Sequence, residues 1–236
     1  MEYNSVIIGK DKTILVDEFK YQYAPLLFRD LIDKNKNFMR GKGFHANNFF
    51  EDDTKLVYVE EPNETWKLKE SDSYSYRVDL LDKVKNKRTS FEIKSKLNKK
   101  VNWITINNTT VVNNEMKLFV RHVLNNGDEE LYLVIIDLNK QQLLSESSIE
   151  TVTIDEAMYT NLEIYNQYNN LGYEKYIVYS TTLYNDEQEE RNIISRQFKV
   201  INTETNEVTP IEFPDGLEID MQSGTVDDNY FVAARM

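Results

Sequence analysis

NNFFEDDTKLVYV, residues 47–59, aligns without a gap on TTVVNNEMKLFVR, residues 109–121, which lies 62 positions further along the chain. Both stretches read as a polar pair, an apolar pair, a turn, a lysine and an apolar run. A fainter copy, SGTVDDNYFVAAR, occupies residues 223–235. Repetition at roughly fifty to sixty residues predicts an array of similar β units, each stacked on its neighbours. A β-propeller is the leading architecture for such an array.

A second repeated pattern lies in the third strand of each predicted unit. An apolar run ends in Asp or Asn and is followed by a polar turn and a short outer strand. The four copies are FRDLIDKNKNF, YRVDLLDKVKN, LVIIDLNKQQL and FKVINTETNEV. Asp and Asn favour such turns because their side chains accept hydrogen bonds from the turn backbone. NNGDE, residues 125–129, predicts a tight hairpin turn in which Gly127 supplies a positive φ.

We therefore predict an all-β fold, a propeller-like array of about four four-stranded units plus a partial fifth. The partial fifth unit is the last stretch, residues 218–236. We expect one domain over residues 1–236, which could be a piece of a longer propeller. A large antiparallel β-sandwich is the alternative, and it explains the strands but not the gapless repeat. Helical periodicity also occurs at residues 20–33 and 149–167, where we favour a strand and a plain connection, respectively.

Composition narrows the function classes. The net charge is −12 and the pI is about 4.8, which disfavours nucleic acid as a partner. The basic residues of 83–100 alternate with other residues around a predicted hairpin, so we interpret them as protecting an edge strand. No cysteine is present, which excludes disulfides and thiolate chemistry. No apolar run approaches the length of a membrane span, so we expect no direct membrane insertion by this chain.

Three residues are candidates for binding a ligand. His45 and Asn47 lie at the start of a predicted innermost strand, which in a propeller borders the central channel. Trp66 lies in a polar loop with Pro62, where an indole is expected to be exposed. We expect the other tryptophan, Trp103, to pack within the sheets, as aromatics on strands usually do. The only other histidine, His122, lies in a different predicted unit from His45, so the two do not have the spacing of metal ligands. We therefore predict no metal site and no cofactor.

Catalytic motifs are missing from the sequence. It has no nucleophile elbow, no phosphate-binding glycine loop and no zinc-protease motif. Carboxylates are plentiful, but Glu51 and Asp52 correspond to Asn113 and Asn114 in the next repeat. Residues that recur in every unit are better explained as turn formers than as a catalytic pair. We predict no catalytic residues and no enzyme activity.

The repeat layout resembles bacterial β-propeller proteins in general, over nearly the whole chain. The resemblance is to an architecture, because the chain lacks the Trp-Asp, paired-glycine, Asp-box and Tyr-Trp-Thr-Asp motifs of the named propeller families. No family residues can be carried over, and fold alone does not imply function. We expect a non-catalytic binding or sensor module of a bacterial cell-envelope protein that docks another protein through a propeller face. In this hypothesis it lies outside the cytoplasm; a cytoplasmic scaffold and a propeller-type glycoside hydrolase with carboxylates in its channel are the alternatives.

Overall fold

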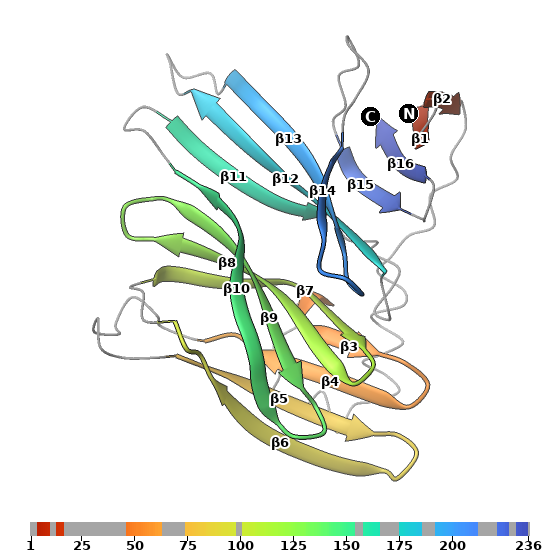
Figure 1. Ribbon diagram of the computed structural model, residues 1–236, viewed down its shortest axis with the longest axis vertical. Helices are drawn as coiled ribbons and strands as arrows, with labels where there is room; N and C mark the ends of the chain where they lie inside the picture. The colour runs from red at the N-terminus through yellow and green to blue at the C-terminus, as the bar shows by residue number, and fades with distance from the viewer. Residues whose placement is uncertain are drawn as a thin grey trace.

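A computed structural model describes residues 4–9, 13–16, 46–62, 74–97, 101–153, 158–165, 175–185, 192–211, 221–226 and 230–235. The fold is all-β, as predicted, and consists of four antiparallel sheets of four strands each (Figure 1). Three of the sheets are simple meanders in which strands follow one another in chain order. A single 3-10 turn, η1 (Ala46–Asn48), precedes the first meander in the described part of the chain.

Sheet β3–β6 contains the first copy of the repeat. Its strands are β3 (Phe49–Glu51), β4 (Lys55–Glu60), β5 (Ser75–Asp82) and β6 (Lys87–Lys94). The last of these, β6, is the edge strand predicted for this stretch, and its basic residues Lys87, Arg88 and Lys94 are exposed.

Sheet β7–β10 contains the second copy of the repeat. Its strands are β7 (Val101–Val112), β8 (Glu115–Leu124), β9 (Glu129–Asp137) and β10 (Gln142–Val152). The turn between β8 and β9 has Gly127 at a φ of 93°, as the Asn-Gly sequence predicts. The helix considered over residues 149–167 is not present in the described part of that range, where the end of β10 and strand β11 occur instead.

Sheet β11–β14 is the third meander, with strands β11 (Met158–Tyr165), β12 (Tyr176–Asn185), β13 (Asn192–Asn202) and β14 (Val208–Ile211). The fourth sheet combines the two ends of the chain in the order β15-β16-β1-β2. Its strands are β1 (Asn4–Gly9), β2 (Thr13–Val16), β15 (Met221–Val226) and β16 (Tyr230–Arg235).

The terminal sheet corrects one prediction. The strands assigned to a partial fifth unit are β15 and β16, and β16 pairs antiparallel with β1 along its whole length, from Asn4 opposite Arg235 to Gly9 opposite Tyr230. A strand edge left unpaired is unfavourable, and backbone pairing between the termini satisfies it. The other strands predicted for the first unit, at residues 25–39, and the alternative helix at residues 20–33 lie outside the described residues.

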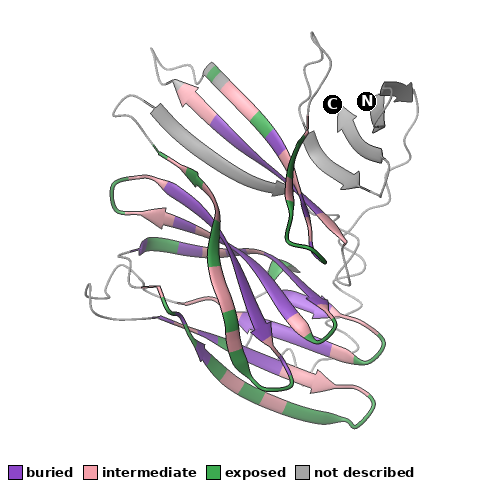
Figure 2. Ribbon diagram, viewed as in Figure 1, coloured by how far each residue is buried: buried purple, intermediate pink, exposed green. Residues whose placement is uncertain are grey.

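Three sheets stack face to face, and their contacts form two cores. The first interface joins sheets β3–β6 and β7–β10 through residues such as Val57, Tyr76 and Leu118. The second interface joins the opposite face of sheet β7–β10 to sheet β11–β14 through Phe119, Tyr179 and their neighbours. Sheet β7–β10 is thus covered on both faces, and the eight residues Glu129 to Ile136 of β9 are all buried (Figure 2). Six of these residues, Leu131 to Ile136, form a continuous apolar run, which is expected for a strand between two packed layers.

Alternation along β8 explains how one strand serves both interfaces. Leu118 and Val120 belong to the first core, whereas Phe119 between them belongs to the second. Successive side chains of a strand point to opposite faces, so an uninterrupted apolar segment covers both. Sheet β3–β6 is also buried on its outer face, where Leu56 and Tyr58 are enclosed although they belong to neither core.

Candidate functional site

Two of the three predicted ligand-binding residues, His45 and Trp66, lie outside the described residues. Asn47 lies in η1, where its side chain is exposed and its carbonyl accepts a hydrogen bond of 2.7 Å from Thr109 Oγ1 of β7. Asn47 and Thr109 occupy the same position in the two copies of the repeat. The backbone of Asn47 therefore connects adjacent units, and its exposed side chain remains a candidate for ligand contact.

His122 lies in a cluster of aromatic and polar side chains at one end of the first interface. Its Nε2 lies 3.2 Å from the Tyr74 hydroxyl, and its ring stacks on Tyr132 with centroids 4.5 Å apart. Tyr132 in turn donates to Glu130 at 3.0 Å. His122 and the nearby Tyr76 are completely buried. A substrate cannot reach groups enclosed in this way, so the cluster serves to join the two sheets.

Glu146 of β10 extends this cluster across the interface. Its carboxylate accepts hydrogen bonds from the Ser95 hydroxyl at 2.8 and 2.9 Å and from the Lys96 backbone at 2.9 Å. Burial raises the pKa of Tyr74 well above its usual value, and the charge of Glu146 raises it further. Tyr74 therefore keeps its proton at any physiological pH and acts as a hydrogen-bond donor.

The second interface contains a similar carboxylate bridge. Glu150, also on β10, accepts a hydrogen bond of 3.1 Å from the Tyr179 hydroxyl and forms an ion pair with Lys199. A register shift between Ser148 and Glu150 marks a β-bulge in β10. Because a bulge inserts a residue into the alternation, it allows Glu146 and Glu150 to face opposite sheets. One strand thereby sends a carboxylate into each interface.

Equivalent lysines of the repeat have different environments in the two interfaces. Lys117 is only 2% exposed, and its ammonium donates to the Thr203 carbonyl and to Asn206 Oδ1, at 2.7 Å for the latter. Burial lowers the pKa of Lys117, and the charges of Glu115 and Glu204 partly oppose this. Its counterpart in the first interface, Lys55, is partly exposed and donates to Asn114 Oδ1 at 3.1 Å.

Asp52 of the repeat forms a turn, as predicted, whereas its neighbour Glu51 pairs with Lys83. Asp52 Oδ1 accepts hydrogen bonds of 2.7 Å from the backbone of Thr54 and of Lys55. Burial raises the pKa of Asp52. The hydrogen bonds that its carboxylate accepts from the Thr54 hydroxyl and from the two backbone N–H groups outweigh this effect, so the pKa is lowered. The carboxylate is therefore ionised near neutral pH and holds the turn between β3 and β4.

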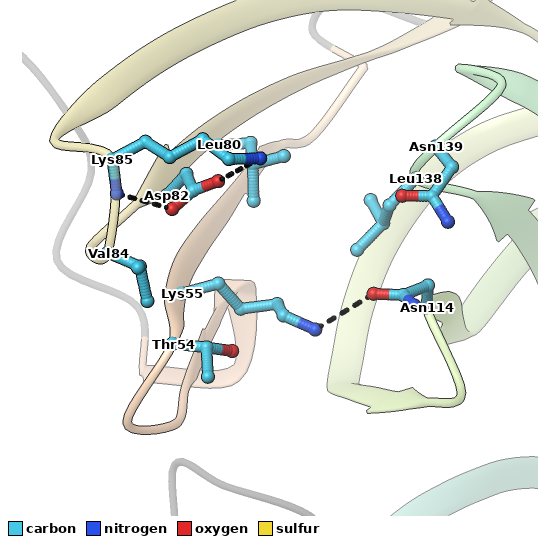
Figure 3. A pocket seen from close by; sticks show the side chains of 9 residues that line it. All are labelled: Thr54, Lys55, Leu80, Asp82, Val84, Lys85, Asn114, Leu138 and Asn139. Carbon is cyan, nitrogen blue, oxygen red and sulfur yellow. Dashed lines mark hydrogen bonds and ion pairs between the residues drawn. The ribbon is translucent and has the colours of Figure 1, made fainter.

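A cavity of about 380 Å³ opens in the first interface, at the end opposite His122. Figure 3 shows Lys55 and Asn114 facing one another from the two sheets, with Lys85 paired to Asp82 nearby. The other lining residues are apolar or uncharged: Thr54, Leu80, Val84, Leu138 and Asn139. The cavity is thus lined by apolar, amide and hydroxyl groups together with the charged groups of Lys55, Lys85 and Asp82.

Trp103 was expected to be packed, but it is 58% exposed on β7. Its Nε1 donates a 2.7 Å hydrogen bond to Thr105 Oγ1, which orients the indole on the surface. A register shift between Val101 and Trp103 marks a bulge that places both Asn102 and Trp103 on the exposed side. Sequence alternation alone does not reveal a bulge, so this candidate binding residue could not be recognised from the pattern.

The described ranges lack two features that would indicate a metal site or a membrane span. They contain no group of three or more His, Asp or Glu side chains placed to hold a metal ion. No helix within them is long and apolar enough to cross a membrane.

No family model matches the sequence, and no curated protein matches it. Solved structures of three mutants of Synechocystis apocarotenoid oxygenase align with 86% of this chain, at 8% identity and TM-scores of 0.39, 0.38 and 0.36. This chain spans 40% of the length of those chains. A likeness at this level supports no conclusion about fold family or activity.

Proposed function

We propose that the sheets are blades of a β-propeller-like array and that the protein is a non-catalytic binding or sensor module. The architecture is supported by successive four-stranded meanders that stack face to face and by a terminal sheet built from both chain ends. In a two-layer sandwich, each sheet would have only one covered face. Sheet β7–β10 is covered on both, which favours the propeller over the sandwich.

The observation that carries the binding role is that buried and partly buried carboxylates are engaged in joining strands and sheets. Glu146 and Glu150 bridge sheets, Glu130 accepts from Tyr132, Glu129 pairs with Arg121, and Asp79 accepts from Ser90. A glycoside hydrolase needs two carboxylates facing a sugar across roughly 5–10 Å. Carboxylates engaged in joining strands and sheets favour a structural role, whereas the cavity and the exposed Trp103 offer surfaces for a partner.

In this proposal the partner is another protein, docked through a face of the array, and the intact protein belongs to a bacterial cell envelope. The acidic composition and the lack of cysteine are compatible with this setting, and the lack of cysteine is equally compatible with a reducing cytoplasm. The compartment can be tested by fractionating the source cells and locating the protein with an antibody. Recovery in the cytosol would reject the envelope assignment and favour a cytoplasmic scaffold.

The binding role is tested by combining activity and binding assays on one set of variants. We expect no turnover on a panel of aryl glycosides, and we expect Trp103→Ala to weaken partner binding without changing the unfolding midpoint. Trp103→Phe, which keeps an aromatic ring, is the matched control. Turnover that is abolished by Glu130→Gln or Glu146→Gln at unchanged stability, with a bell-shaped pH profile, would establish the glycosidase alternative instead.

A further inference from the structure

His122 is a titratable side chain enclosed in the first interface. It is fully buried, and the residue directly opposite it on β9 is Glu130, which is 4% exposed. Directly opposed residues have Cβ atoms about 4.5–5.5 Å apart, so these two side chains are neighbours on one face of the sheet. On its other side, His122 lies opposite the apolar Ile104 of β7. The nearby Tyr76 of β5 stays uncharged, because burial raises its pKa well above the usual value.

Two tyrosines connect the imidazole to two carboxylates. Tyr132 stacks on the ring with an angle of 28° between the planes, and its hydroxyl donates to Glu130 at 3.0 Å. The hydroxyl of Tyr74, immediately before β5, lies 3.2 Å from Nε2 of His122 and 3.5 Å from Oε1 of Glu146 on β10. The carboxylates of the cluster thus approach the imidazole from β9 directly and from β10 through Tyr74.

Protonation of His122 determines where the single proton of the Tyr74 hydroxyl points. A neutral imidazole either accepts a hydrogen bond at Nε2 or donates one, depending on its tautomer. A protonated imidazole can only donate, so the hydroxyl then accepts from Nε2 and its own proton is directed to Glu146. The resulting chain runs from a cation to a carboxylate. Hydrogen bonds between charged groups are roughly twice as strong as neutral ones.

Two opposing effects act on the protonated ring. Burial disfavours any charge, whereas a carboxylate within about 4–6 Å favours a cation. The neighbouring Glu130, the link through Tyr74 to Glu146 and the stacked face of Tyr132 all favour the imidazolium. Three favourable contacts against one burial cost lead us to expect that the charged form is stabilised in the folded protein.

We propose that this cluster is a pH-sensitive joint between sheets β3–β6 and β7–β10, in which His122 takes up a proton as pH falls through the neutral range and thereby strengthens the hydrogen-bonded chain. The chain crosses the first interface twice, from His122 on β8 to Tyr74 beside β5 and back to Glu146 on β10. The joint is therefore weakest at alkaline pH. It involves no surface contact, so it does not depend on the proposed binding function.

The direct test is proton NMR of the whole chain, with the imidazole ring signals followed from pH 5.5 to 9. The chain has two histidines, so His45→Gln identifies the signals of His122. We expect their midpoint at least about one pH unit above the value of roughly 6.5 for an unperturbed histidine. Glu146→Gln, which removes the charge at the end of the chain, should lower this midpoint. Tyr74→Phe, which removes the connecting hydroxyl, should lower it as well.

Glu150→Gln is the matched control. Glu150 also lies on β10 and also accepts a hydrogen bond from a buried tyrosine, Tyr179, but it faces the second interface. Its substitution should leave the His122 midpoint unchanged. A His122 ring that does not titrate in this range, or that titrates below about pH 6.5, would overturn the proposal. Equal midpoints in the parent and in Glu146→Gln would overturn it too.

Stability provides a second readout. A group that binds its proton more tightly in the folded state contributes stability that is complete below its unfolded value and is lost as pH rises through its folded value. The folding equilibrium constant of the parent, divided by that of His122→Gln, should therefore be larger at pH 5.5 than at pH 8.5. The expected decrease is about tenfold for each pH unit by which the midpoint is raised. Tyr74→Phe, which keeps the aromatic ring, should show the same trend with a smaller amplitude. A ratio that is constant or rises with pH would reject the joint.

Discussion

At the scale of single residues, burial decides how much a lysine contributes to the stability of the fold. The ammonium of Lys117 is enclosed with two oxygen acceptors, whereas Lys55 reaches a partner at the surface. Lys117→Met removes hydrogen bonds of a charged donor and leaves buried acceptors unsatisfied. We expect a loss of roughly 1.5–3 kcal/mol in the free energy of unfolding, measured by urea denaturation at pH 7. Lys55→Met should lose less than about 1 kcal/mol; equal losses would contradict the assigned environments.

Tyr179 allows a prediction about pH. Burial raises the pKa of its hydroxyl, and Glu150, its hydrogen-bond acceptor, raises it further. The folded protein then retains a proton that the unfolded chain loses near pH 10, so this contribution to stability is complete below that pH and is lost as pH rises further. We expect the unfolding free energy of Tyr179→Phe to fall less steeply above pH 10 than that of the parent.

Comparing Tyr179→Phe with the parent protein cancels the contributions of the titratable groups that both proteins contain. Tyr74 and Tyr76, whose pKa values burial also raises, remain in the variant, so the alkaline decline should be reduced and not abolished. Denaturation curves at several pH values between 8 and 11 measure this, and parallel curves for the two proteins would refute the role of Tyr179. At neutral pH the variant should be about 1 kcal/mol less stable because it lacks the hydrogen bond to Glu150.

At the scale of elements, the turn that follows the third strand of each meander is the most regular local structure in the fold. Asp82, Asp137 and Asn202 each accept hydrogen bonds from the backbone of the turn they begin. Four residues later, each turn has a positive φ, at Asn86, Gln141 and Asn206. The Asp or Asn was readable from the sequence, because its chemistry is local. The position of the positive φ was not, because Gln141 gives no sign of it.

Gln141 is therefore a site for stabilisation. Its φ is 55°, a region that is unfavourable for a residue with a Cβ and free of that cost for glycine. We expect Gln141→Gly to raise the free energy of unfolding by about 0.5–1 kcal/mol. Asn86→Gly should gain less, since asparagine tolerates this conformation better. Thermal unfolding of the two variants checks the ranking, and destabilisation by Gln141→Gly would argue against the turn geometry.

The two cores can be tested separately through neighbouring residues of β8. Leu118 and Phe119 are fully buried and point into the first and the second interface, respectively. Through lost apolar contact and a cavity, Leu118→Ala should cost about 2–5 kcal/mol and Phe119→Ala about 3–5 kcal/mol. Leu144→Ala, at a partly exposed position on β10, is the control and should cost far less. A cost near zero for either buried residue would remove that interface from the description.

At the scale of the whole molecule, pairing between β1 and β16 joins the ends of the chain. Ser5 lies opposite Ala234 in this pairing. Because the chain has no cysteine, Ser5→Cys with Ala234→Cys should form one intramolecular disulfide, detected as faster migration on a non-reducing gel. Ser5→Cys with Ala233→Cys is the control, since adjacent strand residues point to opposite faces. Equal crosslinking of both pairs would contradict this register.

Local sequence patterns predicted the strands of three of the four sheets, but they could not predict which distant strands pair. The strands beginning at Phe49, Glu115 and Tyr176 follow apolar runs that need no knowledge of distant residues. Two features depended on the three-dimensional arrangement. The end strands were assigned to a partial unit because the sequence does not state which edges meet, and the bulge at Trp103 interrupts an alternation that looked regular.

The hydrogen bond from Thr109 to the Asn47 carbonyl joins equivalent positions of adjacent repeats. The acceptor is a main-chain carbonyl, which every unit provides, and the donor is a side-chain hydroxyl at a position where the first copy has Asn47. A duplicated unit with Thr or Ser at this position therefore bonds to the unit before it without any other substitution. An array of this kind can lengthen by copying, and the enclosed Lys117 and the more exposed Lys55 show that equivalent positions have since diverged.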